Sequence, residues 1–288
     1  MINLRAYAKL DLAIHINPKK SRDNYYPVDY LDCQINLFDT LCFKPINKDI
    51  KLICNNPKVP KNKSNFIYKA AYFLKEKSNI KNLGTIITLE KNIPIKAGFG
   101  GGSSNAAAAI IGLAKLWKIR LTKQLISDLS KYLGKDFYYS YYGGLAEVKG
   151  IGKNYKLAPL PAKSPKFYLL IIIPKKEKPS TCWIYQHLKK SDIGKNLKKY
   201  QALKKSLIDK NKNAIIENLH NDFENSVIFH FPVVGKIKQD LIKSGANQAL
   251  LAGAGLSVVG FFTSQKDANL AKQKLTNKYK QTIISQTI

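Results

Sequence analysis

The segment from Pro94 to Ile110 contains the residues of this chain best suited to bind phosphate. Glycines occupy positions 98, 100, 101 and 102, and two serines, an asparagine and four alanines follow them directly. Glycine allows a polyanion to approach the backbone, and the first turn of a helix presents unpaired N–H groups and a positive dipole end. Alanine has the highest helix propensity, so a helix rather than a flexible linker is expected here. We therefore expect a phosphate-binding loop.

This loop does not fit the two common nucleotide-binding motifs. A P-loop requires lysine and then serine or threonine after its last glycine, whereas Gly102 is followed by Ser103 and Ser104. The dinucleotide-binding motif requires a third glycine at the position that Ser103 occupies. The sequence therefore predicts a nucleotide site of another design.

Two other charged positions could do chemistry beside such a loop. The alternation from Leu4 to Ile16 predicts a strand with Lys9 and Asp11 on one face, close enough to pair. Asp136 follows Gly134, which is expected to end a helix capped by Thr122. Each also has an ordinary interpretation, because Lys9 could face solvent and Asp136 could belong to a turn or a helix cap.

The remaining pattern predicts helices and strands in two domains. Helical spacing is found in 65–77, 103–117, 233–243 and much of 195–218, and strand-like runs in 84–91 and 167–173. Two prolines, at 159 and 161, precede the last of these runs, which gives domains of 1–160 and 161–288. Gly253 and Gly255 lie between two apparent strands in 249–262 and, taken alone, predict only a tight turn.

Composition narrows the class of protein without identifying it. The chain has 288 residues, 45% of them hydrophobic, which is enough for a substantial core. Its four cysteines and four histidines show no metal-binding spacing, so reduced thiols and no structural zinc are expected. We see no apolar run that would span a bilayer and no secretion signal, and we expect a soluble cytoplasmic protein without membrane contact.

The formal net charge of +29 is the most unusual property of the composition. Such a charge attracts nucleic acids, anionic membranes and anionic small molecules alike, so it does not choose among them. Lysine dominates and is spread along the chain, and lysine, asparagine and isoleucine are all abundant, as in proteins from AT-rich genomes. We give this coding bias more weight than a role in nucleic-acid binding.

Three segments occur in the order of the three motifs of the GHMP kinase superfamily: residues 8–10, 94–107 and 251–260. Residues 100–107, 133–136 and 221–224 resemble the branch that phosphorylates 4-diphosphocytidyl-2-C-methyl-D-erythritol. The resemblance implies an α/β (α+β) fold of two domains, a ribosomal protein S5 domain 2-like N-terminal domain and a ferredoxin-like C-terminal GHMP domain, with the active site between them.

The resemblance also implies the reaction and the residues that perform it. ATP, accompanied by Mg²⁺, would transfer its γ-phosphoryl group to the 2-hydroxyl of the cytidyl-methylerythritol, a step of the non-mevalonate isoprenoid pathway. Asp136 matches the general base and Lys9 the catalytic lysine, and Gly253 lies in the third motif. Tyr25 and Tyr185 lie where the family places aromatic rings around the cytosine. The expected ATP loop consists of Pro94, Ile95, Lys96, Ala97, Gly98, Phe99, Gly100, Gly101, Gly102, Ser103 and Ser104.

Several positions depart from the family pattern. Tyr26 replaces a histidine that contacts the cytosine, Asp11 replaces an asparagine, and Tyr138 replaces a proline. We expect Tyr26 to bind the cytosine, since tyrosine can stack and hydrogen-bond, and Asp11 to orient Lys9. Two other functions stay open: another GHMP kinase of a small alcohol, and a basic nucleic-acid-binding protein. The favoured partners are ATP and the small substrate, with no nucleic acid and with a monomer or weak homodimer.

Overall fold

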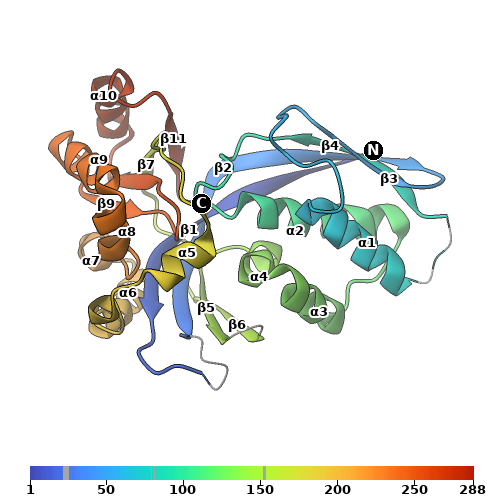
Figure 1. Ribbon diagram of the computed structural model, residues 1–288, viewed down its shortest axis with the longest axis horizontal. Helices are drawn as coiled ribbons and strands as arrows, with labels where there is room; N and C mark the ends of the chain where they lie inside the picture. Colours follow the sequence, from blue (N-terminus) through green and yellow to red (C-terminus); the bar gives the residue numbers. More distant parts are fainter. Residues whose placement is uncertain (22–25, 79, 81, 152–153) are drawn as a thin grey trace.

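The computed structural model describes residues 1–21, 26–78, 80, 82–151 and 154–288 (Figure 1). Two sheets and the helices around them form a mixed α/β fold, which confirms the expected class. The first sheet has seven strands in the order β3-β4-β2-β1-β8, with β5 paired to β2 and β6 to β5. Its strands are β1 (Ile2–Ile16), β2 (Val28–Ile46), β3 (Ile50–Cys54), β4 (Gly84–Glu90), β5 (Ala146–Ile151), β6 (Asn154–Pro159) and β8 (His220–Asn221).

Four helices cover one face of this sheet (Figure 1). Alanines in the second helix allow it to lie close to the two long strands, and a core of 27 buried apolar residues fills the space between helices and sheet. The expected helices in this part are confirmed, including the Thr122 cap, whose side chain accepts from Leu125 N. The helices are α1 (Phe66–Ser78), α2 (Gly101–Trp117), α3 (Lys123–Leu133) and α4 (Lys135–Tyr142).

The second sheet is antiparallel and has the order β11-β7-β10-β9. Numbered along the chain from β7, this order is 4-1-3-2, which is the ferredoxin-like arrangement expected for the C-terminal part. The helices at 232–243 and 265–276 pack against one face of this sheet, whereas the helix at 197–208 lies on the face that meets β1. The strands are β7 (Tyr168–Ile172), β9 (Gln248–Leu251), β10 (Val258–Phe262) and β11 (Thr282–Gln286), and the main helices are α6 (Leu197–Ile208), α7 (Lys212–Asn218), α8 (Glu224–His230), α9 (Pro232–Lys243) and α10 (Gln265–Thr276).

Strand β1 is buried on both faces over its second half. Ala8 to Ile16 are all buried, whereas the first residues of the strand alternate between half-buried and exposed. Helix α2 covers one face, and residues of the second sheet, among them Leu169 and Phe261, pack into the same core as Leu10. Lys9 and Asp11 therefore lie inside the protein, so a solvent-facing Lys9 is excluded.

The expected boundary between residues 160 and 161 falls in the connection from β6 to β7. One element from the later part of the chain crosses back, because β8 pairs in parallel with Ala13 and Ile14 of β1. The boundary itself stays a prediction. Short α5 (Thr181–Gln186) lies between the two groups of helices (Figure 1), and the 3₁₀ turn η1 (Lys190–Asp192) contacts α8 through Ser226.

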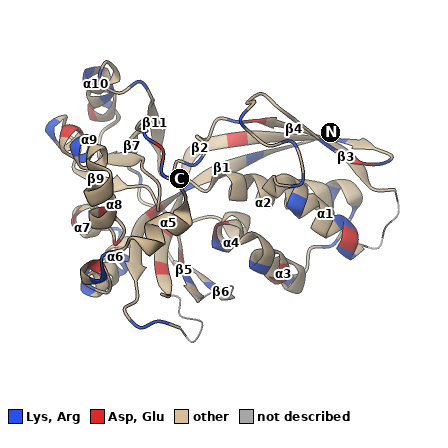
Figure 2. Cartoon of the chain, viewed as in Figure 1, with Lys and Arg blue, Asp and Glu red and all other residues tan. Residues whose placement is uncertain are grey.

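The expectation of reduced cysteines is confirmed, because all four have free thiols. In the described ranges, the structure contains no cluster of three or more metal-ligating side chains and no helix long and apolar enough to cross a bilayer. Lys and Arg are spread over both halves instead of following one stripe (Figure 2).

Candidate active site

Lys9 and Asp11 form a buried ion pair on β1. Both oxygens of Asp11 lie 2.5 Å from Lys9 Nζ, and the two residues are 4% and 1% exposed. The backbone N–H of Lys9 donates to Phe99 O at 3.1 Å, which attaches the glycine loop to the strand. Burial disfavours the charged ammonium, but Asp11 and Asp136 outweigh this effect and raise the pKa of Lys9. Lys9 is therefore a fixed positive charge.

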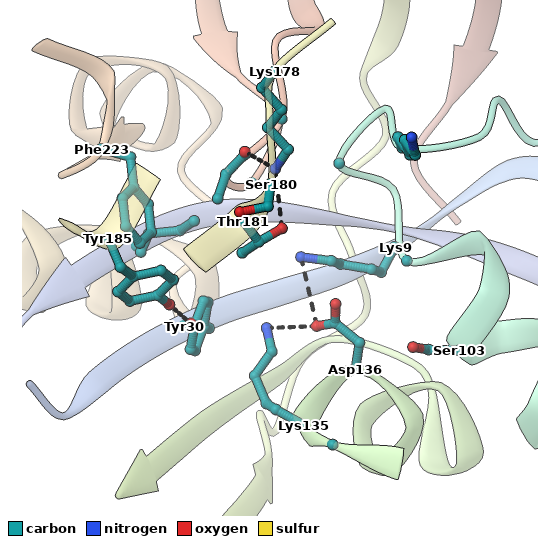
Figure 3. Close-up of a pocket in the computed structure, with 18 of the residues that line it drawn as sticks. Lys9, Tyr30, Ser103, Lys135, Asp136, Lys178, Ser180, Thr181, Tyr185 and Phe223 are labelled. Atoms are coloured by element: carbon teal, nitrogen blue, oxygen red, sulfur yellow. Dashed lines mark hydrogen bonds and ion pairs between the residues drawn. The ribbon is translucent and has the colours of Figure 1, made fainter. Parts of the chain in front are cut away.

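Asp136 faces this lysine from the first turn of α4. Gly134, with φ of 97°, separates α3 from α4 and directs the new helix N-terminus toward Lys9. Asp136 Oδ1 lies 2.9 Å from Lys135 Nζ and 3.8 Å from Lys9 Nζ (Figure 3). Its side chain is 36% exposed, so solvent and ligands can reach it. Burial alone would raise the pKa of Asp136, but the two ammonium groups hold it well below its ordinary value.

The glycine loop leads into α2 as expected. Gly100 has φ of 65° and precedes the first helical residue, and a Cβ at this position would lie 2.9 Å from the Lys9 side chain. The first N–H groups of α2 have no partner within the helix and create a positive end. Ser103 lines the adjacent cavity, whereas Ser104 Oγ donates to Gly101 O at 3.1 Å within the helix. The helix start is thus a site for anionic oxygens.

Asp39 holds the approach to this loop in place. One carboxylate oxygen accepts from the backbone N–H groups of Asn92 and Ile93 at 2.6 and 2.7 Å. The other accepts from Lys91 Nζ and from Asn105 Nδ2 of α2, each at 2.7 Å. Asp39 is fully buried. Four donors on one carboxylate tie the loop to the helix that follows it.

The turn at Gly253 closes the opposite side of the loop. A Cβ at Gly98, where φ is 95°, would lie 2.1 Å from Ala252 O, so the two backbones are in direct contact. Asn221 Nδ2 donates to Leu251 O and Gly253 O, at 3.0 and 2.8 Å, and attaches the turn to β8. The turn is therefore part of the site, beyond the tight turn that its sequence alone predicts.

Lys178 links this turn to the start of α5. Its Nζ donates to Thr181 Oγ1 at 3.0 Å and to Ala254 O (Figure 3). Burial, together with the positive charge of Lys9, lowers the pKa of Lys178 to about 8. This ammonium is thus more easily neutralised than an ordinary lysine.

These elements surround a cavity of about 580 Å³. Lys9, Asp136 and Lys135 lie on one side, and an aromatic wall of Tyr30, Tyr185 and Phe223 lies beside them (Figure 3). The hydroxyls of the two tyrosines are 3.2 Å apart, and the rings of Tyr185 and Phe223 have centroids 4.8 Å apart. Burial and the neighbouring Tyr185 raise the pKa of Tyr30, so its hydroxyl keeps its proton.

A second cavity, of about 480 Å³, is lined by residues 94–97 of the loop and by residues 173–178, Leu256 and Ser257. Lys96 and Lys178 border both cavities. An elongated anionic ligand could therefore extend along the glycine loop from one cavity to the other. The hydroxyl of Ser257 is buried without a hydrogen-bond partner among the described residues.

The structure brings together most of the residues expected in the site. The first cavity is lined by Lys9, Lys96, Gly98, Gly100, Ser103, Asp136, Tyr185 and Gly253, and the second by Pro94, Ile95, Lys96 and Ala97.

Other expected residues lie outside both linings. Asp11 lies behind Lys9, Phe99 is buried in the core, and Gly101, Gly102 and Ser104 belong to the first turn of α2. Tyr26 packs against the core of the second half with Lys20 Nζ over its ring, 5.0 Å from the centroid. Tyr25 falls outside the described residues.

Five further residues line the first cavity but were not predicted from the sequence: Lys135, Lys178, Tyr30, Thr181 and Phe223. Two of them had a signal in the sequence, because Lys135 adjoins Asp136 and Phe223 lies inside the 221–224 motif. Tyr30, Lys178 and Thr181 had none.

Comparison with known proteins agrees with this geometry. The family model "GHMP kinases N terminal domain" matches residues 65–147, and "GHMP kinases C terminal" matches residues 200–281. The chain is 32% identical to the 4-diphosphocytidyl-2-C-methyl-D-erythritol kinase of Acetivibrio thermocellus over 287 residues, which cover 100% of this chain and 99% of the relative. It is 35% identical to the Clostridioides difficile protein of the same name, covering 98% of this chain and 94% of the relative.

Solved structures share the fold. A crystal structure of 4-(cytidine 5'-diphospho)-2C-methyl-D-erythritol kinase superposes with a TM-score of 0.81 at 24% identity, covering 99% of each chain. The mevalonate kinase of L. major in complex with R-mevalonate superposes with a TM-score of 0.75 at 14% identity, covering 100% of this chain and 96% of the other.

Proposed function

Since this chain belongs to the 4-diphosphocytidyl-2-C-methyl-D-erythritol kinases, a branch of the GHMP kinases, we propose that it transfers the γ-phosphoryl group of ATP to the 2-hydroxyl of that substrate. The observation that supports this most directly is the convergence of Lys9 and Asp136 on the cavity at the start of α2. A carboxylate, an ammonium and free helix N–H groups are the groups that phosphoryl transfer to an alcohol requires.

The phosphates of ATP lie along the glycine loop in this proposal. The N–H groups of α2 and the Ser103 hydroxyl donate to phosphate oxygens, and Lys9 and Lys178 offset the negative charge. The nucleoside end of ATP extends into the second cavity, whose lining contains Pro94, Ile95 and Ala97. The rigid attachment of the loop to Asp39 keeps these donors in place before the ligand arrives.

Asp136 accepts the proton of the acceptor hydroxyl. The hydroxyl oxygen bonds to the γ-phosphorus, the bond from that phosphorus to the β,γ-bridging oxygen breaks, and the electron pair leaves on ADP. A carboxylate with a lowered pKa is a weak base, but the transition state of phosphoryl transfer is loose, so the proton can move late. Asp136 therefore orients the hydroxyl first and receives its proton as the new bond forms.

Mg²⁺ bound to ATP would neutralise part of the charge of the β- and γ-phosphates. Magnesium is commonly held by phosphates and one or two protein oxygens instead of an all-protein cage. The Ser103 hydroxyl, which lines the cavity at the start of α2, would supply the protein oxygen.

The cytidyl group of the acceptor stacks on the aromatic wall in this proposal. Tyr185 and Phe223 form an edge-to-face pair, and Tyr30 adds a hydroxyl at the same place. Tyr26, which replaces the family histidine, lies outside the cavity lining, so its role in binding cytosine stays a prediction. We expect a cytoplasmic enzyme because ATP is its donor, and we retain the monomer or weak homodimer as an expectation.

A coupled kinase assay tests the proposed function. The purified protein is incubated with ATP, Mg²⁺ and either 4-diphosphocytidyl-2-C-methyl-D-erythritol, mevalonate or homoserine, and ADP formation is measured. We expect turnover with the first substrate and little with the others. Equal turnover of mevalonate or homoserine would assign the chain to another GHMP activity.

The Asp136→Asn variant tests the residue roles. We expect kcat to fall by about 10²–10⁴-fold with ATP binding retained, because the amide cannot accept the proton. Asp128→Asn, the same change at a partly exposed residue of α3 outside both cavity linings, is the matched control and should behave as wild type. Near-normal kcat in Asp136→Asn would refute the role of Asp136 as base.

A further inference from the structure

Two buried carboxyl groups lie opposite each other beneath the catalytic pair. Asp11 of β1 and Asp32 of β2 are direct partners in the antiparallel ladder, so their side chains share one face of the sheet. They are 1% and 0% exposed, and each carboxyl group affects the pKa of the other. Like charges directly opposite in a ladder are destabilising, and burial increases the effect. This pair of carboxyl groups therefore needs a nearby positive charge or a proton.

The two neighbouring lysines do not balance the negative charge of the nearby carboxylates if every one of these groups is ionised. Lys9 and Lys135 supply two positive charges, whereas Asp11, Asp32 and Asp136 supply three negative charges. One added proton would make this five-residue cluster neutral. Its location inside the protein makes neutrality strongly favourable.

The contacts indicate which carboxyl holds the proton. Asp11 has Lys9 Nζ at 2.5 Å and Lys135 Nζ at 3.6 Å, and Asp136 is partly exposed, with Lys135 Nζ at 2.9 Å. Within the described part of the chain, the ion pair of Asp32 is with Lys135 Nζ, at the longer distance of 3.4 Å, and its Oδ1, like Oδ1 of Asp136, is buried without a hydrogen-bond partner there. A proton on Asp32 could be donated to the carboxylate of Asp11, which is its direct partner in the ladder. The same proton would remove the unsatisfied charge.

We propose that Asp11 and Asp32 share one proton at neutral pH, held on Asp32, and that Asp32 is thereby a positioning residue for Lys135 and Asp136. This proposal rests on the proposed kinase function for its effect on catalysis, but not for the protonation itself. With Asp32 neutral, Lys135 is free to pair with Asp136, and the carboxylate of Asp11 is left to Lys9.

The environment of Asp32 supports a retained proton. Burial is the first cause that raises its pKa, followed by opposing effects of Lys135 and Asp11. Glu147 of β5 accepts from Tyr200 and Lys204. The other titratable groups around Asp32 are Lys9 and Asp11 of β1, Lys135, Asp136 and Tyr139 of α4, Tyr30 and Cys33 of β2, and Tyr200 of α6. Lys9 and Lys135 are the only cations among these named groups.

Infrared spectroscopy of the intact protein tests the shared proton directly. At neutral pH we expect a C=O band of a protonated carboxylic acid that shifts when aspartate is labelled with ¹³C. The band should disappear in Asp32→Asn. It should also disappear in Asp11→Asn, because the cluster is then neutral without an added proton. A band that persists in Asp11→Asn would mean that burial alone protonates Asp32. This result would contradict a proton shared between Asp11 and Asp32.

Asp29→Asn is the matched control, because it makes the same change on β2 at a residue outside the cluster, and it should retain the band. The amide of Asp32→Asn imitates a neutral carboxyl, so Lys135 should stay paired with Asp136 and the pH profile of kcat should keep its wild-type shape. A wild-type protein without the band, or an acidic limb of the profile that shifts in a folded Asp32→Asn, would overturn the proposal. The band is measured without substrate, so it remains informative even if the kinase assay fails.

Discussion

Replacing Asp39 by alanine should destabilise the protein and loosen the phosphate loop. Asp39 is completely buried and accepts hydrogen bonds from two backbone N–H groups, from Lys91 and from Asn105, at 2.6–2.7 Å. Alanine would leave these donors without their acceptor. The ammonium of Lys91, whose side chain is 6% exposed, would then be a nearly buried charge without its carboxylate.

The magnitude follows from the loss of the ion pair and its hydrogen bonds. Four independent hydrogen bonds to a charged group would sum to about 6–12 kcal/mol, but water and local movement satisfy part of the loss. Breaking a buried pair by removing one partner typically costs about 3–5 kcal/mol. We therefore expect the free energy of unfolding to fall by about 3–5 kcal/mol, a large part of the stability of an ordinary domain.

The assay is urea unfolding of wild type and Asp39→Ala. Asp128→Ala is the control at a partly exposed carboxylate, and the loss of its contacts with Gln124 and Lys131 should change stability by less than about 1 kcal/mol. Burial already lowers the pKa of Lys91 while Asp39 opposes this effect, so the variant should lower it further. Lys91 then loses its proton more readily, and the difference from wild type should narrow as pH rises from about 7 to about 10. A loss below about 1 kcal/mol, or a difference that widens with pH, would refute the reasoning.

Three further changes probe the site. Gly98→Ala should lower the free energy of unfolding by about 2 kcal/mol or more and raise KM for ATP, since its Cβ would meet a backbone oxygen at 2.1 Å. Gly144 also has a positive φ but faces open space, so Gly144→Ala should lower the stability measured by thermal unfolding by only about 1 kcal/mol. In wild type KM for ATP should rise as pH passes about 8, where Lys178 loses its charge, and Lys178→Arg should flatten this profile. Lys135→Met removes the nearest cation of Asp136 and raises its pKa, so kcat should fall at acidic pH where wild type stays constant. An unchanged profile in either lysine variant, or equal losses in the two glycine variants, would contradict these expectations.

Local sequence signals predicted much of the fold. The alternation of β1, the alanines of α2 and the Thr122 cap each act over a few residues, and the structure confirms them. β8 gave no such signal, because a two-residue strand is defined only by its distant partner, β1. The 19-residue β2 was also missed. It pairs with β1 along its length, with β5 at its start and with β4 at its end, so its burial does not alternate simply.

The site was predictable where a motif fixed both residue and backbone. The pairing of Lys9 with Asp11 followed from strand geometry, and the structure confirms it. The contacts of Lys135 depend on the direction in which α4 leaves Gly134, which propensities do not specify. Tyr30 and Asp32 enter the site because β2 places them against β1 and α4. Tyr26 precedes this strand, which begins at Val28, and packs elsewhere.

The two residues of β8 have a consequence for synthesis of the chain. During translation β1 can pair with β2 early, but its other edge near Ala13 and Ile14 stays open until residues about 206 positions later emerge, as the Ile16 N–H to Asp222 hydrogen bond shows. An open apolar strand edge can pair with other chains. A nascent chain that stalls before residue 220 would therefore carry an aggregation-prone edge next to its finished glycine loop. The last part of the chain both completes the kinase cleft and covers this edge.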